Sequence, residues 1–303
     1  MTHSTLSGVL PVISTPFDAR GAIDDGALRH ELNWVLDHGV SGITVGMVSE
    51  VMRLGDDERQ HLDEMVVSVC AARQALSVVS CGSESVERAV SLARHAQDVG
   101  ASALMAIAPV TVALDDDGQF GYFRDLLCAT RIPMVVQDAS GYVGRPLSLG
   151  VMTRLLDEFG DRVYFKPEAQ PLGQRLSALR DTTAGRARVF EGTGGVALVD
   201  SYRRGVVGTM PGAEVCWAVV ALWRALQAGE WALAYEISGP LALLIDLQTS
   251  LDSYVAVEKH ILWRQGVLAS TAARGPTSYD LDDETRDEID RLVDRLSSAA
   301  RPT

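Results

Sequence analysis

Short runs of apolar and β-branched residues alternate with helical patterns along most of this chain. Such alternation is typical of βα units, because parallel strands need a long crossover connection that is usually a helix. Each segment between two runs carries apolar residues at helical spacing. The runs that we interpret as strands are 8–14, 42–45, 76–80, 103–108, 133–136, 162–166, 188–191 and 205–209.

Eight such units end at about residue 228, close to the ~250 residues of a typical eight-fold barrel. We therefore expect an α/β fold, a (β/α)8 TIM barrel with a C-terminal helical extension. The barrel and its active site would span 1–228, and 229–303 would pack on it. The extension is expected to be helical over 231–251, 254–265 and 284–296. A doubly wound open sheet is the alternative, because a sequence pattern alone does not fix topology.

The composition excludes several classes of function. The chain is 47% hydrophobic and carries a net charge of -13 without a long basic run, which argues against binding to nucleic acid. No leader pattern and no apolar run of ~18 residues is present, so we expect a cytoplasmic protein without a membrane partner. The four cysteines lack C-x-x-C spacing and the six histidines lie away from the expected strand ends. We expect buried reduced thiols and no metal site.

Lysine is rare in this sequence. The chain has 27 Lys and Arg residues in total, and only Lys166 and Lys259 are lysines. An amine can lose its proton and attack a carbonyl carbon, which a guanidinium cannot do at ordinary pH. Lys166 ends an apolar strand, and in a barrel these strand ends build the active site. Desolvation there favours the neutral amine, which is the form that makes a Schiff base.

A structural role is the alternative for each lysine. Lys166 could extend to solvent from the strand end and pair with Glu168. Lys259 lies beside Glu258 and His260 in the C-terminal part, where a solvated helical face explains it.

Four motifs, spread over nearly the whole chain, add a likeness to known proteins. They are GVLPVISTPFD at 8–18, GMVSE at 46–50, PMVVQDASG at 133–141 and YFKPE at 164–168. Together they resemble the dihydrodipicolinate synthase / N-acetylneuraminate lyase superfamily, whose corresponding motifs are T-P-F, G-T-T-G-E, Y-N-x-P and V-G-x-K-[ED]. The resemblance implies an imine at Lys166, a small 2-keto acid as substrate, no other cofactor, and a homo-oligomer, tetramer or dimer.

Several motif positions depart from the family pattern. Gln137 replaces a tyrosine that relays protons in many members, and Met47 and Val48 replace two threonines. A synthase or a sialic-acid aldolase that relies on this relay therefore fits poorly. The same departures resemble the branch that contains 2-keto-3-deoxy-L-arabinonate dehydratase, which has S-E, Q-D-A and F-K-x-E at these positions. The chain has all three, at 49–50, 137–139 and 165–168.

The resemblance suggests roles for further residues. Glu50 and Glu168 are the candidate acid and base beside the catalytic Lys166. As alternatives, Glu50 could cap a turn or pair with Arg53, and Glu168 could be a counter-ion of the lysine. A plain turn is the alternative for the glycine-rich loop 191–195. The candidate substrate-binding residues are Gly46, Ser49, Gln137 and Gly192.

Three functions remain open at this stage. The first is dehydration of a 2-keto-3-deoxy sugar acid through an imine. The second is cleavage or formation of a carbon–carbon bond by a pyruvate-dependent class I aldolase. The third is a catalytically retired barrel that binds a keto acid without converting it. If the amine of Lys166 were exposed on the outer surface, the first two functions would be excluded.

Overall fold

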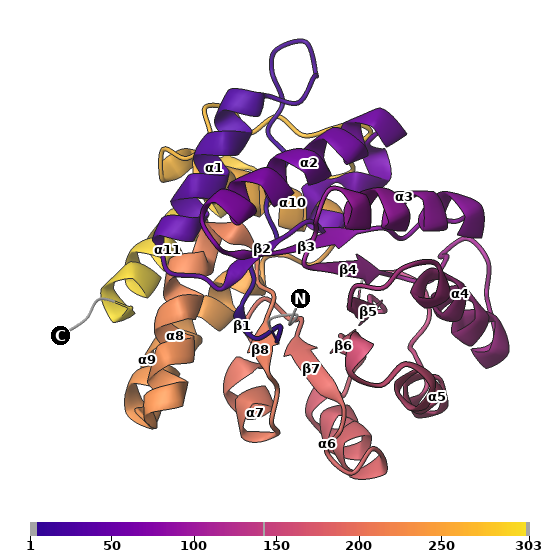
Figure 1. The fold of residues 1–303 in the computed structure, drawn as a ribbon. Coiled ribbons are helices and arrows are strands. Elements are labelled where there is room, and N and C mark those ends of the chain that lie inside the picture. The colour runs from indigo at the N-terminus through magenta and orange to yellow at the C-terminus, as the bar shows by residue number, and fades with distance from the viewer. Residues whose placement is uncertain (1–4, 142, 301–303) are drawn as a thin grey trace.

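Parallel strands form a closed barrel in the computed structural model, which describes residues 5–141 and 143–300 (Figure 1). They are hydrogen-bonded in the order β1-β8-β7-β6-β5-β4-β3-β2. The ring closes where Val12 bridges to both Thr44 and Gly212. The expected fold class is confirmed. The strands are β1 Gly8–Val9, β2 Gly42–Thr44, β3 Leu76–Ser80, β4 Ala103–Ala106, β5 Met134–Asp138, β6 Val163–Pro167, β7 Arg188–Glu191 and β8 Gly208–Thr209.

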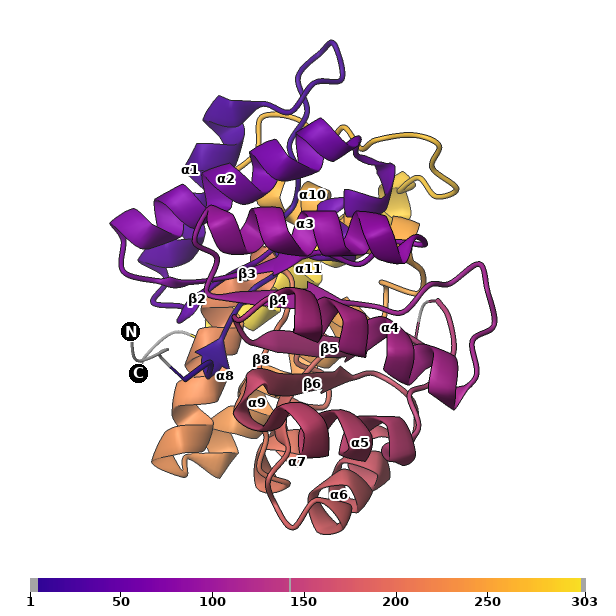
Figure 2. The ribbon, with the colours of Figure 1, turned by 45° about the vertical axis from the view of Figure 1, so that its right-hand side comes forward.

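Helices surround the barrel, as Figures 1 and 2 show for α2 to α6. Many begin at a Ser or Asp whose side chain accepts an amide of the first turn, for example Ser85, Asp115 and Ser148. They are α1 Asp25–Asp37, α2 Asp56–Ala72, α3 Val86–Asp98, α4 Asp116–Ala129, α5 Leu149–Phe159, α6 Leu172–Thr182, α7 Leu198–Arg203 and α8 Cys216–Ala228. Short 3-10 turns are η1 Met47–Ser49, η2 Val51–Arg53, η3 Gly160–Arg162 and η4 Ala213–Val215.

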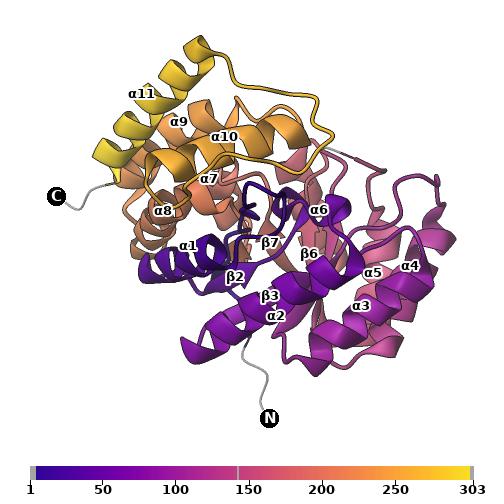
Figure 3. The same ribbon diagram turned by 90° about the horizontal axis from the view of Figure 1, so that it is seen from above.

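The C-terminal helices gather on one side of the barrel (Figure 3). They are α9 Trp231–Ile245, α10 Leu251–Arg264 and α11 Asp283–Ala299. Helix α9 packs on α8 and α11, whereas α10 contacts η4 and η1. Because η1 follows β2, α10 lies over the carboxyl ends of the strands. No helix in the described part of the chain is long and apolar enough to cross a membrane.

Two hydrophobic layers hold the barrel together. Side chains from alternate strand positions fill its interior, and a more extensive layer lies between the strands and the helices. Residues facing inward therefore alternate with residues facing the helices. The interior layer consists of Leu6, Leu10, Val12, Val78, Ala103, Met105, Val135, Tyr164, Phe190 and Met210.

Several local expectations are corrected by the structure. The first strand ends at Val9, because Pro11 has no amide hydrogen to continue the ladder; its carbonyl still accepts the amide of Thr44. Lys259 is fully buried and does not lie on a solvated face. Among the cysteines, Cys128 is exposed, whereas the other three are buried.

Three glutamates are buried close together where α1, η4 and α10 meet. Glu31 accepts the amide of Ser14, Glu214 accepts the side-chain amide of Gln248, and Glu258 accepts the amide of Ala213. The second oxygen of each carboxyl group has no hydrogen-bond partner. Burial raises the pKa of Glu31 to about 8 and that of Glu214 to about 7, and it also raises the pKa of Glu258.

This cluster predicts a stability that falls as the pH rises. Between the pKa of an unfolded glutamate, about 4.3, and the raised value in the folded protein, the native state binds more protons than the unfolded state, so unfolding becomes easier with increasing pH. We expect Glu31→Gln to reduce this slope by up to ~1.4 kcal/mol per pH unit between pH 5 and 8. Urea unfolding at several pH values measures it. Glu236→Gln, at an exposed position of α9, is the control and should leave the slope unchanged. An equal slope in Glu31→Gln and the wild type would contradict the prediction.

Candidate active site

Lys166 lies inside the barrel end, where β6 terminates, and is 5% exposed. Its strand partner is Gln137 of β5, because the register of the two parallel strands sets these residues side by side. The amine lines a narrow cavity of about 30 Å³ at the carboxyl ends of the strands. The cavity wall consists of Val12, Gly46, Met47, Val48, Met105, Gln137, Lys166, Glu168, Gly192, Met210, Leu251 and Tyr254.

A carboxyl group is the nearest charged partner of the amine. Glu168 Oε1 lies 3.0 Å from Lys166 Nζ, and it also accepts a hydrogen bond of 2.8 Å from Gln137 Nε2. Glu168 Oε2 is buried and has no hydrogen-bond partner. One oxygen is thus held by two donors, while the other is available for a proton or for the hydroxyl of a ligand.

Burial governs the titration of Glu168. Desolvation raises its pKa above the ordinary value of a glutamate, while the charge of Lys166 and the hydrogen bond from Gln137 oppose this rise. A carboxyl group whose pKa moves toward neutrality can both accept and release a proton near pH 7. The structure therefore places a buried carboxyl group with a raised pKa beside the amine.

Gly46 and Gly192 lie so close to other residues of the cavity that a larger residue would crowd their side chains. A Cβ atom at Gly192 would lie 3.0 Å from Lys166 Cε and from Glu168 Cγ, and one at Gly46 would lie 3.0 Å from Val12 Cγ1. Such contacts are tight, so a side chain at Gly192 would require Lys166 and Glu168 to shift by a few tenths of an ångström. Both glycines therefore line the cavity as backbone, which agrees with their expected position.

Ser49 does not face the cavity. Its hydroxyl donates to the carbonyl of Ile13 and accepts the amide of Gly46, and the residue is fully buried. The hydroxyl that was expected to bind a ligand is instead held by these two backbone groups, and Ser49 is absent from the cavity wall. The cavity is lined instead by Met47 and Val48, the first two residues of η1. Their amides have no acceptor within that turn.

Glu50 is also turned away from the amine of Lys166. One carboxyl oxygen lies 2.6 Å from Lys259 Nζ, and the other accepts the amide of Arg274 at 2.6 Å. Glu50 is absent from the cavity wall. The expectation of an acid or base at this position, and the alternative of a pair with Arg53, are both corrected: Arg53 pairs with Asp252.

Helix α10 contributes residues that the sequence analysis missed. Leu251 and Tyr254 line the cavity from the side of the C-terminal extension. No motif marks them, because their place in the site results from the packing of α10 over the strand ends. The turn of 191–195 is held by Glu191, which accepts the amide of Thr193 and the hydroxyl of Thr209. In the described part of the chain, His, Cys, Asp and Glu side chains form no group suited to a metal ion.

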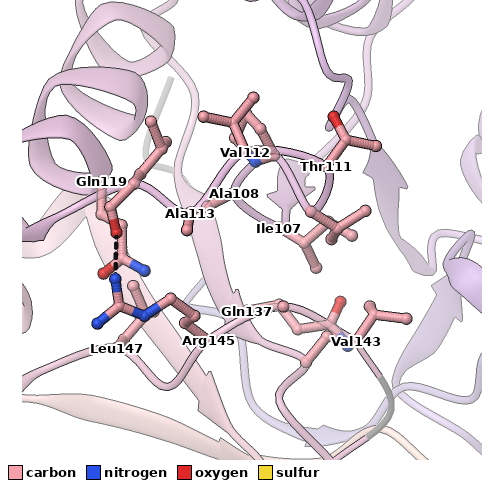
Figure 4. Close-up of a pocket in the computed structure, with 15 residues that line it drawn as sticks. Ile107, Ala108, Thr111, Val112, Ala113, Gln119, Gln137, Val143, Arg145 and Leu147 are labelled. Carbon is pink, nitrogen blue, oxygen red and sulfur yellow. Dashed lines mark hydrogen bonds between the residues drawn. The ribbon is translucent and has the colours of Figure 1, made fainter.

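A larger chamber of about 250 Å³ adjoins the cavity, and Gln137 lines both (Figure 4). Its walls come from the loops that follow β4 and β5. Arg145 donates to the carbonyl of Leu114 at the edge of the chamber, and the buried Gln119 carries an amide oxygen without a partner. The chamber therefore offers a set of polar groups within reach of Gln137.

The shared hydrogen bond predicts how Gln137 affects Glu168. Because the bond from Gln137 lowers the pKa of Glu168, Gln137→Leu should raise it further. Carbon-13 NMR of labelled glutamate carboxyl groups measures the titration, and Glu168→Gln assigns the signal. Gln170→Leu is the matched control, since the Gln170 side chain accepts the amide of Leu172 instead. An unchanged or lower pKa in Gln137→Leu would refute this account.

Comparison with known proteins identifies the family of this chain. The profile of the Dihydrodipicolinate synthetase family matches residues 5–296. The 4-hydroxy-tetrahydrodipicolinate synthase of Bartonella quintana is 29% identical over 177 residues, which cover 58% of this chain and 60% of the relative. That of Brucella suis is 26% identical over 238 residues, 78% of this chain and 80% of the relative.

Solved structures agree over almost the entire length. The dihydrodipicolinate synthase of Rhodopseudomonas palustris superposes with a TM-score of 0.87 at 25% identity, and the match covers 96% of this chain and 98% of the other. YagE of Escherichia coli K12, solved in complex with pyruvate, has the same fold with a TM-score of 0.88 at 21% identity, covering 97% and 99%. From the profile match over nearly all of its length, this chain belongs to the dihydrodipicolinate synthetase family.

Proposed function

We propose that this protein is a Schiff-base lyase that dehydrates a 2-keto-3-deoxy sugar acid through an imine at Lys166. The observation that carries the proposal is the enclosed pair of Lys166 and Glu168, 3.0 Å apart, with one carboxyl oxygen unpartnered. The amine is the nucleophile that attacks the keto carbon of the substrate. The carboxyl group, whose pKa is raised, can transfer protons at the neighbouring carbon atoms.

The proposed reaction begins with attack of the neutral amine of Lys166 on the C2 carbonyl, and water leaves as the protonated imine forms. The imine withdraws electrons, so Glu168 can take a proton from C3. The resulting enamine expels the C4 hydroxyl, which Glu168 protonates so that it departs as a second water. Hydrolysis of the conjugated imine then releases the product. The protonated imine at Lys166 is the electron sink, and the route calls for no added cofactor.

The Glu168 carboxyl group replaces the pair of carboxylates that the sequence analysis considered. Gln137 cannot relay a proton, but its hydrogen bond of 2.8 Å orients Glu168 toward the amine. The substrate carboxylate would bind the backbone of Met47 and Val48, which face the cavity.

The chamber beyond Gln137 supports a substrate longer than pyruvate. The cavity at Lys166 suits only the keto-acid end, whereas the adjoining space of about 250 Å³ can receive a hydroxylated tail. Gln119 offers an amide group, the Thr111 hydroxyl, which donates to Glu84, can still accept a hydrogen bond, and Arg145 lies at its edge. Such groups match sugar hydroxyls, which both donate and accept hydrogen bonds.

A pyruvate-dependent aldolase is the second candidate. The names of the relatives favour it, since they are synthases, and YagE was solved with pyruvate. Both reactions pass through an imine at Lys166 and differ in their products. Dehydration releases water and keeps the carbon chain intact, whereas aldol cleavage yields pyruvate and an aldehyde. As for other members of the family, we expect a homo-oligomer.

Trapping of the imine tests the proposed chemistry directly. Reduction with borohydride in the presence of a 2-keto acid should add the reduced acid to the peptide that contains Lys166 and leave Lys259 unmodified. Mass spectrometry of the digested protein reads both lysines. We expect Lys166→Arg to abolish the adduct and to lower turnover by roughly 10³-fold or more.

The same experiment with a series of 2-keto acids distinguishes the dehydratase, the aldolase and a binding protein. A 2-keto-3-deoxy sugar acid that is converted with loss of water supports the dehydratase, and release of pyruvate from it supports the aldolase. Reversible binding of keto acids without any adduct would refute both and would leave a binding protein. Turnover that survives in Lys166→Arg would contradict the mechanism.

The chamber predicts a selective effect of Gln119. Gln119→Leu removes one hydrogen bond to the tail of the substrate, so the KM for a six-carbon 2-keto-3-deoxy acid should rise about tenfold, equivalent to about 1.4 kcal/mol. Trapping of pyruvate should not change, because pyruvate is too short to reach this side chain. Gln227→Leu, on α8 at the opposite end of the barrel, is the matched control. A parallel loss for both ligands would count against the chamber as the tail site.

A further inference from the structure

Lys259 is the second lysine of the chain, and it is buried without forming part of the cavity wall. Its amine lies 2.6 Å from a carboxyl oxygen of Glu50. It also donates to the carbonyl of Thr15 at 2.8 Å and to that of Ala272 at 2.6 Å, and it lies 4.7 Å from the ring centre of Phe17. Two backbone carbonyls and one carboxylate therefore surround this ammonium group.

These contacts join segments that are far apart in the sequence. Thr15 lies in the loop after β1, Glu50 follows η1 after β2, and Ala272 belongs to the segment between α10 and α11. The hydroxyl of Thr15 donates in turn to the carbonyl of Ser49 at 2.6 Å. Lys259 thus holds the turn 46–50 at its end, both directly and through Thr15.

The same turn and the same helix form one wall of the cavity. The turn contributes Gly46, Met47 and Val48, and α10 contributes Leu251 and Tyr254. Lys259 lies on α10 and ties this helix to the turn. This connection thus joins the two parts of the wall, and both parts line the same cavity as Lys166.

The backbone of Glu50 needs such support. Its φ of 59° lies in the left-handed region, which side-chain-bearing residues seldom adopt. The buried ion pair with Lys259 and the bond from the amide of Arg274 hold it there. Removing one partner of a buried pair leaves an uncompensated charge, which strongly destabilises the local structure.

We propose that Lys259 is a positioning residue of the active site, which fixes the turn 46–50 against α10 through Glu50 and Thr15. It touches no substrate and acts on the reaction only through the shape of the wall that faces Lys166. The inference concerns the same site as the proposed function, and it rests on that function only for its effect on a keto acid.

Hydrogen exchange tests the positioning independently of any activity. In Lys259→Met, amides of the turn 46–50 should exchange at least tenfold faster than in the wild type, whereas those of α3 should not change. His260→Ala is the matched control: His260 is also buried on α10 but bonds Asp290 of α11, so the turn should stay protected. Should Lys259→Met not fold, the double variant Lys259→Met with Glu50→Gln removes the unpaired charge and carries the same measurement.

Pyruvate provides the second measurement. In the variant that folds, the pyruvate concentration that half-saturates trapping at Lys166 should rise at least tenfold, while the maximal trapped fraction stays the same, because the amine itself is untouched. Wild-type exchange at 46–50 together with wild-type half-saturation would overturn the proposal. A wild-type protein that traps no keto acid would refute the proposed function alone, since the exchange measurement still decides the role of Lys259.

Discussion

An amine and a carboxyl group held 3.0 Å apart and away from water are the interaction on which the candidate site depends. Lys166 and Glu168 are separated by one residue, so the end of a single strand delivers both. The parallel register then brings Gln137 beside them. A burial of this kind is unfavourable for isolated charges, and it persists here because Glu168 Oε1 has two donors. The remaining oxygen is left free for chemistry.

The second lysine repeats this arrangement for a different purpose. Lys259 is also paired with a glutamate at the same end of the barrel, but two backbone carbonyls accept hydrogen bonds from it as well. These carbonyls tie Lys259 to two distant segments, which suits a connector, whereas Lys166 lies in the cavity wall beside the unpartnered Oε2 of Glu168. The two lysines thus differ in their surroundings, which are backbone from distant segments for Lys259 and the candidate site for Lys166.

The C-terminal helices take part in the site. Helix α10 closes one side of the cavity and carries Lys259, and the adjacent Glu258 belongs to the buried glutamate cluster. Packing, substrate wall and buried charge are therefore concentrated on one helix. Changes in this helix are expected to affect stability and the shape of the cavity together, because neighbouring positions serve each purpose.

The sequence by itself predicted the barrel, because eight alternating units can bury their apolar faces around a closed parallel sheet, and it predicted the place of Lys166, because strand ends meet at one edge of a barrel. It also indicated Glu168, Gln137 and the two glycines by motif. Only the tertiary structure decided the roles of Ser49 and Glu50, whose partners Ile13 and Lys259 come from distant segments. The position of a residue in the sequence predicts that it lies at the carboxyl end of the strands. The direction of its side chain depends on tertiary contacts, which form only when the chain is folded.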